Sequence, residues 1–119
     1  MSGVLFIVSM DPAESQRLAQ PLRDRGWSVE LKPADADAIC ERAGACRPVA
    51  MVVPLDPDPE MACDLACSLS VAAATESVPV VFVGGSAEDR AAALAARPDA
   101  TVVDQDQLPW RLKQLSLGN

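Results

Sequence analysis

The fold of this chain is decided by residues 48–59, which read Pro48-Val49-Ala50-Met51-Val52-Val53-Pro54-Leu55-Asp56-Pro57-Asp58-Pro59. The first half of this stretch is a continuous apolar run, which is typical of a strand covered on both faces in the middle of a parallel sheet. The second half is a loop rich in Asp and Pro. Open α/β sheets carry their working groups beyond the carboxyl ends of the central strands, so we expect functional residues between Pro54 and Asp58.

Outward from this stretch, short apolar runs alternate with segments of helical periodicity. Strands are expected at residues 4–8, 27–31, 78–83 and 100–103, and helices at 12–25, 34–45, 60–74, 87–96 and 107–117. Strict alternation predicts an α/β fold with a parallel sheet, helices on both faces and right-handed crossovers. The length of 119 residues suits one domain, residues 1–119. In the helix at residues 60–74 we expect Met61, Leu65, Leu69 and Ala72 to face the core.

The composition excludes several classes of function. The net charge is −7, with ten Lys and Arg residues scattered among 17 acids, so binding of nucleic acid by this chain alone is not expected. Histidine is absent, which removes the commonest general base and metal ligand. No apolar run approaches the ~20 residues that cross a membrane, and the start has no basic segment of a signal peptide. We therefore expect a cytoplasmic protein that is not an enzyme, has no cofactor and does not bind membranes.

The four cysteines are Cys40, Cys46, Cys63 and Cys67. In a cytosolic chain they are expected to be reduced. Four thiolates suit Zn²⁺, but the spacing contains no CxxC pair, so small packed thiols are the interpretation that we favour and no metal site is predicted. Cys63 and Cys67 are four residues apart on one helix and are expected to be partly exposed. A metal-sensing or redox-sensing role for this pair stays open as an alternative.

Four segments of the chain resemble receiver domains of bacterial response regulators. They are Val4 to Pro12, Leu22 to Val29, Arg47 to Val53, and Val78 to Gly84. The resemblance covers essentially the whole chain, and within the family the chain is similar to the chemotaxis regulators. It implies a flavodoxin-like, doubly wound (βα)5 fold with the strand order 2-1-3-4-5.

The same resemblance implies that the phosphorylation site is degenerate. In the family, two adjacent acids after the first strand help to hold Mg²⁺, an ion that prefers oxygen ligands. These positions fall on Ser9 and Met10, and only the next acid, Asp11, is kept. The phospho-accepting aspartate that ends the third strand falls on Pro54, which has no nucleophile.

The later positions of the pattern also differ from the family. The Thr or Ser at the end of the fourth strand is Gly84, and the Lys at the end of the fifth strand is Asp104, which has the opposite charge. The aromatic switch position falls on Thr101. A register shifted by two residues is the alternative, with Asp11, Asp56 and Ser86 at the site and Asp56 as phospho-acceptor. It places Asp106 at the lysine position, and a phosphoryl group between acids without a cation is electrostatically poor.

These observations predict a pseudo-receiver: a phosphorylation-independent interaction or dimerisation module in a bacterial two-component pathway or phosphorelay. Trp110 points away from Leu108 and Leu112 by helical phase, and an exposed Trp is a suitable interface anchor. Since the family often pairs through its fourth and fifth helices and fifth strand, a homodimer or another signalling partner is expected on that side. Packing of Trp110 against a neighbouring helix is the alternative.

Overall fold

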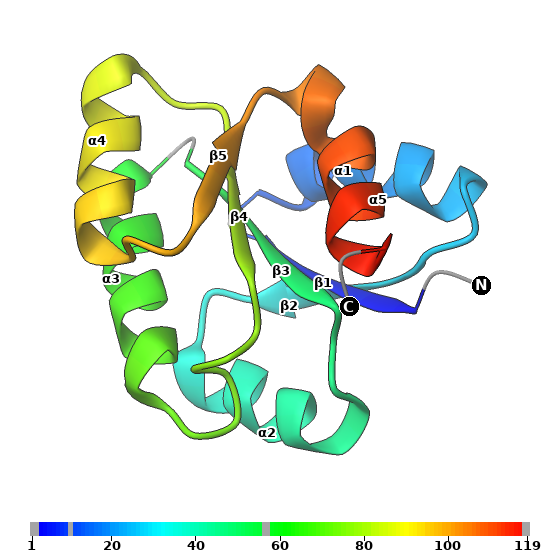
Figure 1. The fold of residues 1–119 in the computed structure, drawn as a ribbon, viewed down its shortest axis with the longest axis horizontal. Helices are drawn as coiled ribbons and strands as arrows, with labels where there is room; N and C mark the ends of the chain where they lie inside the picture. Colours follow the sequence, from blue (N-terminus) through cyan, green and yellow to red (C-terminus); the bar gives the residue numbers. More distant parts are fainter. Residues whose placement is uncertain (1–2, 10, 56–57, 118–119) are drawn as a thin grey trace.

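The computed structural model describes residues 3–9, 11–55 and 58–117. In this part of the chain five parallel strands form one sheet in the order β2-β1-β3-β4-β5 (Figure 1). The strands are β1 (Val4–Ser9), β2 (Ser28–Pro33), β3 (Ala50–Pro54), β4 (Val80–Val83) and β5 (Thr101–Val103). The helices are α1 (Pro12–Asp24), α2 (Ala36–Cys46), α3 (Pro59–Val71), α4 (Ala87–Ala96) and α5 (Leu108–Leu117), with a 3-10 turn η1 (Gln105–Gln107) before α5. The predicted doubly wound receiver-like topology is confirmed.

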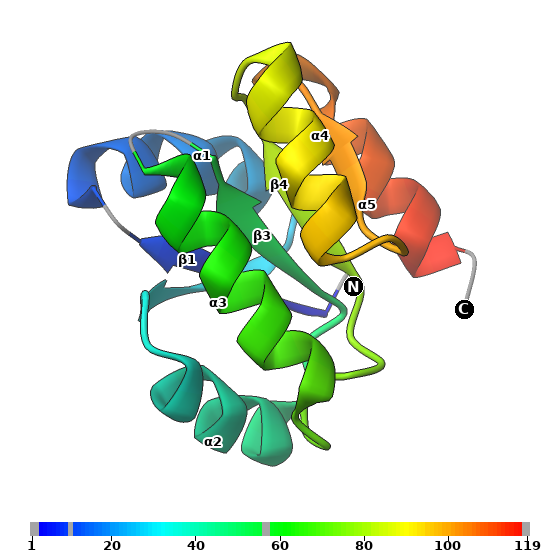
Figure 2. The same cartoon turned by 90° about the vertical axis from the view of Figure 1, so that its left-hand side faces the viewer.

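The helices cover the two faces of the sheet in separate layers (Figures 1 and 2). Alternate residues of β1 show the division: Phe6 and Val8 pack in the layer of α2, α3 and α4, whereas Leu5 and Ile7 pack in the layer of α1 and α5. Every residue of β3 is buried because both of its faces are covered. The continuous apolar run of this strand is the direct cause of its central position.

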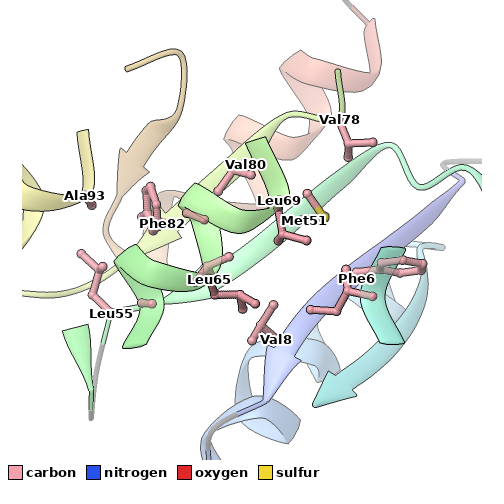
Figure 3. Packing of buried hydrophobic residues seen from close by; sticks show 14 of the residues in the cluster. Phe6, Val8, Met51, Leu55, Leu65, Leu69, Val78, Val80, Phe82 and Ala93 are labelled. Atoms are coloured by element: carbon pink, nitrogen blue, oxygen red, sulfur yellow. The ribbon is translucent and has the colours of Figure 1, made fainter. Parts of the chain in front are cut away.

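The inward face of α3 differs from the prediction. Leu65 and Leu69 do point at the sheet beside Met51 (Figure 3). Met61, however, is 45% exposed, and its predicted place in the core is wrong. Ala62 and Ala66 are buried instead, because small side chains let the helix lie close to the sheet.

A buried cation explains why α3 ends at Val71 rather than at residue 74. The guanidinium of Arg97 is 1% exposed, and its Nη2 donates to the carbonyl oxygens of Thr75 (3.4 Å), Glu76 (3.1 Å) and Val78 (2.9 Å). The Thr75 hydroxyl donates to the Leu69 carbonyl at 2.6 Å. These contacts fold residues 72–79 into a turn, although the alanines there favour a helix.

No helix in the described ranges is long and apolar enough to cross a membrane.

Candidate receiver-type site

Three of the predicted site positions meet at the carboxyl edge of the sheet. The residue Pro54 ends β3 and is paired with Val83, the last residue of β4. Gly84 follows at once, and its N–H donates to the carbonyl of Val103 at 3.1 Å. Asp104 is the next residue after β5. The strand register thus places Pro54, Gly84 and Asp104 along one edge.

The middle of this edge is filled by hydrocarbon. Pro54 is buried, and Leu55 is 0% exposed. The N–H of Leu55 donates to the Val83 carbonyl at 2.9 Å, which carries the ladder one residue past Pro54. Above Leu55 lies the turn of Gly84 and Gly85, each with φ of +81°. A Cβ on Gly85 would lie 2.7 Å from Leu55 Cδ1, so only glycine fits this turn without displacing the leucine.

The outer part of the edge is held by Arg90, which the sequence reasoning missed. Its Nε donates to the Gly84 carbonyl at 3.0 Å, and its Nη2 forms an ion pair with the Asp104 carboxylate. The Asp104 N–H donates to Gln107 Oε1 at 3.3 Å. One side chain of α4 therefore ties the β4–α4 turn to the end of β5. Arg90 lies four residues after the helix-capping Ser86, which is the only sequence signal that could have drawn attention to it.

The polar residues of the shifted register act as helix caps in the described structure. The Asp11 carboxylate accepts from the Ala13 N–H at 3.0 Å, and the Ser86 hydroxyl accepts from the Asp89 N–H at 3.2 Å in a full capping box. Asp106 is exposed within η1. Asp56, the proposed acceptor of that register, lies outside the described residues, as do Met10 and the side chain of Ser9.

The remaining predicted positions lie on β5 and α5. Thr101 is half-buried at the start of β5, and its hydroxyl accepts from Arg111 Nη2 at 3.1 Å. Trp110 is 61% exposed on the outer side of α5, so the alternative that it packs against a neighbouring helix is wrong. Thr101 and Trp110 are therefore apart from the edge formed by Pro54, Gly84 and Asp104.

The cysteines do not gather into a cluster. Cys40 and Cys46 are half-buried beside other elements of their layer, with Cys40 Sγ 3.7 Å from Thr75 Oγ1. Cys67 is exposed and donates to the Ala96 carbonyl of α4 at 3.5 Å. Burial raises the pKa of the Cys63 thiol, and its neighbours Cys67, Asp64 and Asp89 raise it further. Such a thiol is less often a thiolate, which makes it a weaker nucleophile and metal ligand.

The comparisons with known proteins identify the fold. No protein-family model matches the sequence, and no curated protein matches it. Among solved structures, the receiver domain of a sensor histidine kinase from Pseudomonas aeruginosa is 17% identical with a TM-score of 0.77, and each chain is covered fully (100%). That structure has a magnesium ion coordinated in its active-site cleft.

Two further solved structures show the same likeness. The chemotaxis response regulator CheY4 of Vibrio cholerae is 15% identical with a TM-score of 0.73, covering 97% of this chain and 99% of its own. A streptococcal redox sensor of a family that evolved from two-component response regulators is also 15% identical with a TM-score of 0.73, covering 98% of this chain and 52% of its own. The chain thus has the fold of response-regulator receiver domains.

The donors at this edge do not fit a magnesium ion. Ser9 and Met10 offer a hydroxyl and a thioether where carboxylates are needed, and Pro54 offers no side-chain oxygen. Asp104 is neutralised by Arg90, and Asp11 caps α1. Within residues 3–9, 11–55 and 58–117, no three His, Cys, Asp or Glu side chains are placed to share a metal ion.

Proposed function

We propose that this chain is a receiver-like signalling domain that works without phosphorylation, as a protein-interaction or dimerisation module. It is not an enzyme and takes no cofactor, and it acts in the cytoplasm of a bacterium within a two-component pathway. The observation that carries the proposal is the Arg90–Asp104 ion pair beside the fully buried Leu55. The edge that receives a phosphoryl group in a working receiver is already occupied by the protein's own groups.

The electrostatics of the edge support the same conclusion. A phosphoryl group carries about −1.5 to −2 charges at neutral pH and needs cations nearby. The single guanidinium at the described edge, that of Arg90, is committed to Asp104 and to the Gly84 carbonyl. An incoming phosphoryl group would have to displace a carboxylate that is tethered to the same fold.

Exposure to acetyl phosphate with Mg²⁺, followed by intact mass measurement, tests this proposal directly. We expect no stable adduct of one phosphoryl group on the wild type. An adduct that disappears in Asp56→Asn would establish the shifted register instead, and an adduct that persists in that variant would locate phosphorylation elsewhere. Either adduct would overturn the proposal.

The partner surface is expected around Trp110, whose indole is exposed on α5. Pairing of two copies through α4, β5 and α5 stays a prediction. It is checked by size exclusion of the wild type against Trp110→Ala, in which loss of a dimer peak is expected. A folded Trp110→Ala variant that elutes with the wild type at every concentration would count against this surface.

The thiol-sensor alternative has one supporting observation, the streptococcal redox sensor with this fold. Against it stands the geometry of a helical pair. Side chains four residues apart on a helix have Cβ atoms ~5–6 Å apart, whereas a disulfide needs ~3.5–4.5 Å. Cys63 and Cys67 therefore cannot bridge while α3 is intact. Thiol titration after mild peroxide should still find four reduced thiols, whereas loss of two would favour the sensor.

A further inference from the structure

The net charge of the chain is concentrated in one segment. Seven of the 17 acids lie within residues 48–89, where Lys and Arg are absent, so the ten remaining acids balance the ten Lys and Arg residues elsewhere. This segment contains β3, α3 and β4 together with the start of α4. The protein is therefore electrically two-sided rather than uniformly acidic.

The negative side is the outer surface of α3. Glu60, Asp64, Cys67 and Val71 follow one another at helical spacing on this surface and are all exposed. We call these four residues the α3 surface. Its carboxylates form no ion pair within the described ranges, and Val71 at its end is 82% exposed. Figure 2 shows α3 in front of the sheet with no other element across it.

The positive side is formed by α5, where Lys113 is exposed and Arg111 is half-buried. Arg111 and Lys113 have no carboxylate partner in the described part of the chain, since Arg111 is bonded only to Thr101 and Gln114. Trp110, the residue before Arg111, has an exposed indole. We call Trp110, Arg111 and Lys113 the α5 surface.

The two surfaces belong to opposite layers of the sheet and cannot meet within one copy (Figure 1). Each has what the other lacks: unpaired carboxylates beside an exposed aliphatic group on α3, and unpaired cations beside an exposed aromatic group on α5. We infer that the α5 surface of one copy docks on the α3 surface of a second copy. The inference rests on the part of the proposed function that makes Trp110 an interaction anchor. It adds that the partner of Trp110 is the α3 surface of a second copy of this chain.

The geometry of this contact is heterologous. Each copy uses a different surface from its neighbour, so the α3 surface of one copy and the α5 surface of the other remain free in a pair. Further copies can add at these free surfaces, and the assembly is either a closed ring or an open filament, depending on the rotation between neighbouring copies. The symmetric pairing through α4, β5 and α5 would stop at two copies, which makes the two arrangements distinguishable by mass.

Sedimentation velocity over a concentration series tests the docking. At about 20 mM NaCl we expect the average mass of the wild type to rise past two copies, and at about 500 mM NaCl to fall to one copy because salt screens the charges. Trp110→Ala and Asp64→Lys should each weaken association about tenfold or more, as loss of an anchor or reversal of a charge does in an interface centre. Glu41→Lys is the matched control: it changes the charge equally, on the exposed side of α2, and should associate like the wild type.

A mixing experiment separates this contact from symmetric pairing. Trp110→Ala keeps an intact α3 surface and Asp64→Lys keeps an intact α5 surface. Each is expected to be monomeric alone, and an equimolar mixture should form a dimer and nothing longer. Far-ultraviolet circular dichroism checks that both variants are folded. A wild type that stays monomeric at low salt, or two monomeric variants that fail to combine, would overturn the inference, whatever the acetyl phosphate experiment shows.

Discussion

Replacement of Arg97 by methionine removes the group that holds the turn after α3. Methionine keeps much of the length and apolar bulk of the side chain but cannot donate to the Thr75, Glu76 and Val78 carbonyls. Loss of a charged donor from a buried carbonyl costs about 1.5–3 kcal/mol. The bonds of 2.9 Å and 3.1 Å count fully and the bond of 3.4 Å counts little, which gives about 3–6 kcal/mol.

Two smaller effects change this sum. The ion pair of Arg97 with the exposed Asp99, at 3.4 Å, adds well below about 1 kcal/mol because water screens it. The Nη1 of Arg97 is buried without a partner, so removal of this charge returns part of its desolvation cost. We therefore expect Arg97→Met to lower the free energy of unfolding by about 2–4 kcal/mol, a large share of the ~5–15 kcal/mol typical of a domain.

Urea unfolding followed by circular dichroism measures this change. With an m-value of about 2 kcal/mol/M, in the usual range for urea, the midpoint should fall by about 1–2 M while the slope stays the same. Arg25→Met on the exposed end of α1 is the control and should stay within about 0.5 kcal/mol of the wild type. An Arg97→Met variant equally close to the wild type would refute the reasoning, because the carbonyls of the turn would then be satisfied without the guanidinium.

Three further changes test other parts of the structure. Gly85→Ala should destabilise the protein by about 1–3 kcal/mol through overpacking and the positive φ. Gly44→Ala is the control and should be neutral or stabilising, because no atom lies within 4 Å of a Cβ at this position of α2. Equal melting temperatures for the two variants would contradict this prediction. The pKa of Glu30 is lowered from 4.5 to about 2 by hydrogen bonds and charges of its basic neighbours, so its stabilisation is present above pH 4.5 and is lost as the pH falls towards 2. Glu30→Gln should therefore cost about 1 kcal/mol at neutral pH and flatten the acid limb of a stability–pH curve; an unchanged limb would show that the ion pairs contribute nothing. Asp104→Asn should cost less than about 1 kcal/mol yet speed amide exchange in the β4–α4 turn. Asp104→Glu keeps the carboxylate and leaves the Arg90 bond to the Gly84 carbonyl in place, so it should retain most of the protection; uniform exchange in all variants would count against the tie.

The strands and caps could be predicted because their causes are local. The apolar run before Pro54 requires cover on both faces, and every residue of β3 is buried. The capping box of Ser86 and Asp89 has an equally local cause, since both partners lie within one turn. The exposed Trp110 followed from helical phase alone. Features of this kind depend on residues that are neighbours in the sequence.

The roles of the two arginines could not be predicted in this way. Arg90 and Arg97 have long side chains, and their partners lie 14 and about 20 residues away in sequence. Which carboxylate or carbonyl each meets depends on the packing of α4 against the sheet. Met61 was misplaced for a related reason, since periodicity gives the inner face of a helix but not which flank approaches a neighbour. The contact that fills the edge beyond β3 could not be predicted from the sequence either, because Leu55 and Gly85 are far apart in the chain and only the fold brings them together.

The contact between Leu55 and Gly85 also constrains how this protein can change over evolutionary time. The two positions share one fixed volume, with bulk on one side and a missing side chain on the other. A larger residue at position 85 would need a smaller residue in place of Leu55 and also a different backbone conformation, because a φ of +81° is strained for any side chain whatever the space. Among relatives that keep this turn, position 85 should therefore remain glycine even where Leu55 is replaced by a smaller residue. An open edge would therefore require a change in the backbone of this turn as well as in the side chain of Leu55.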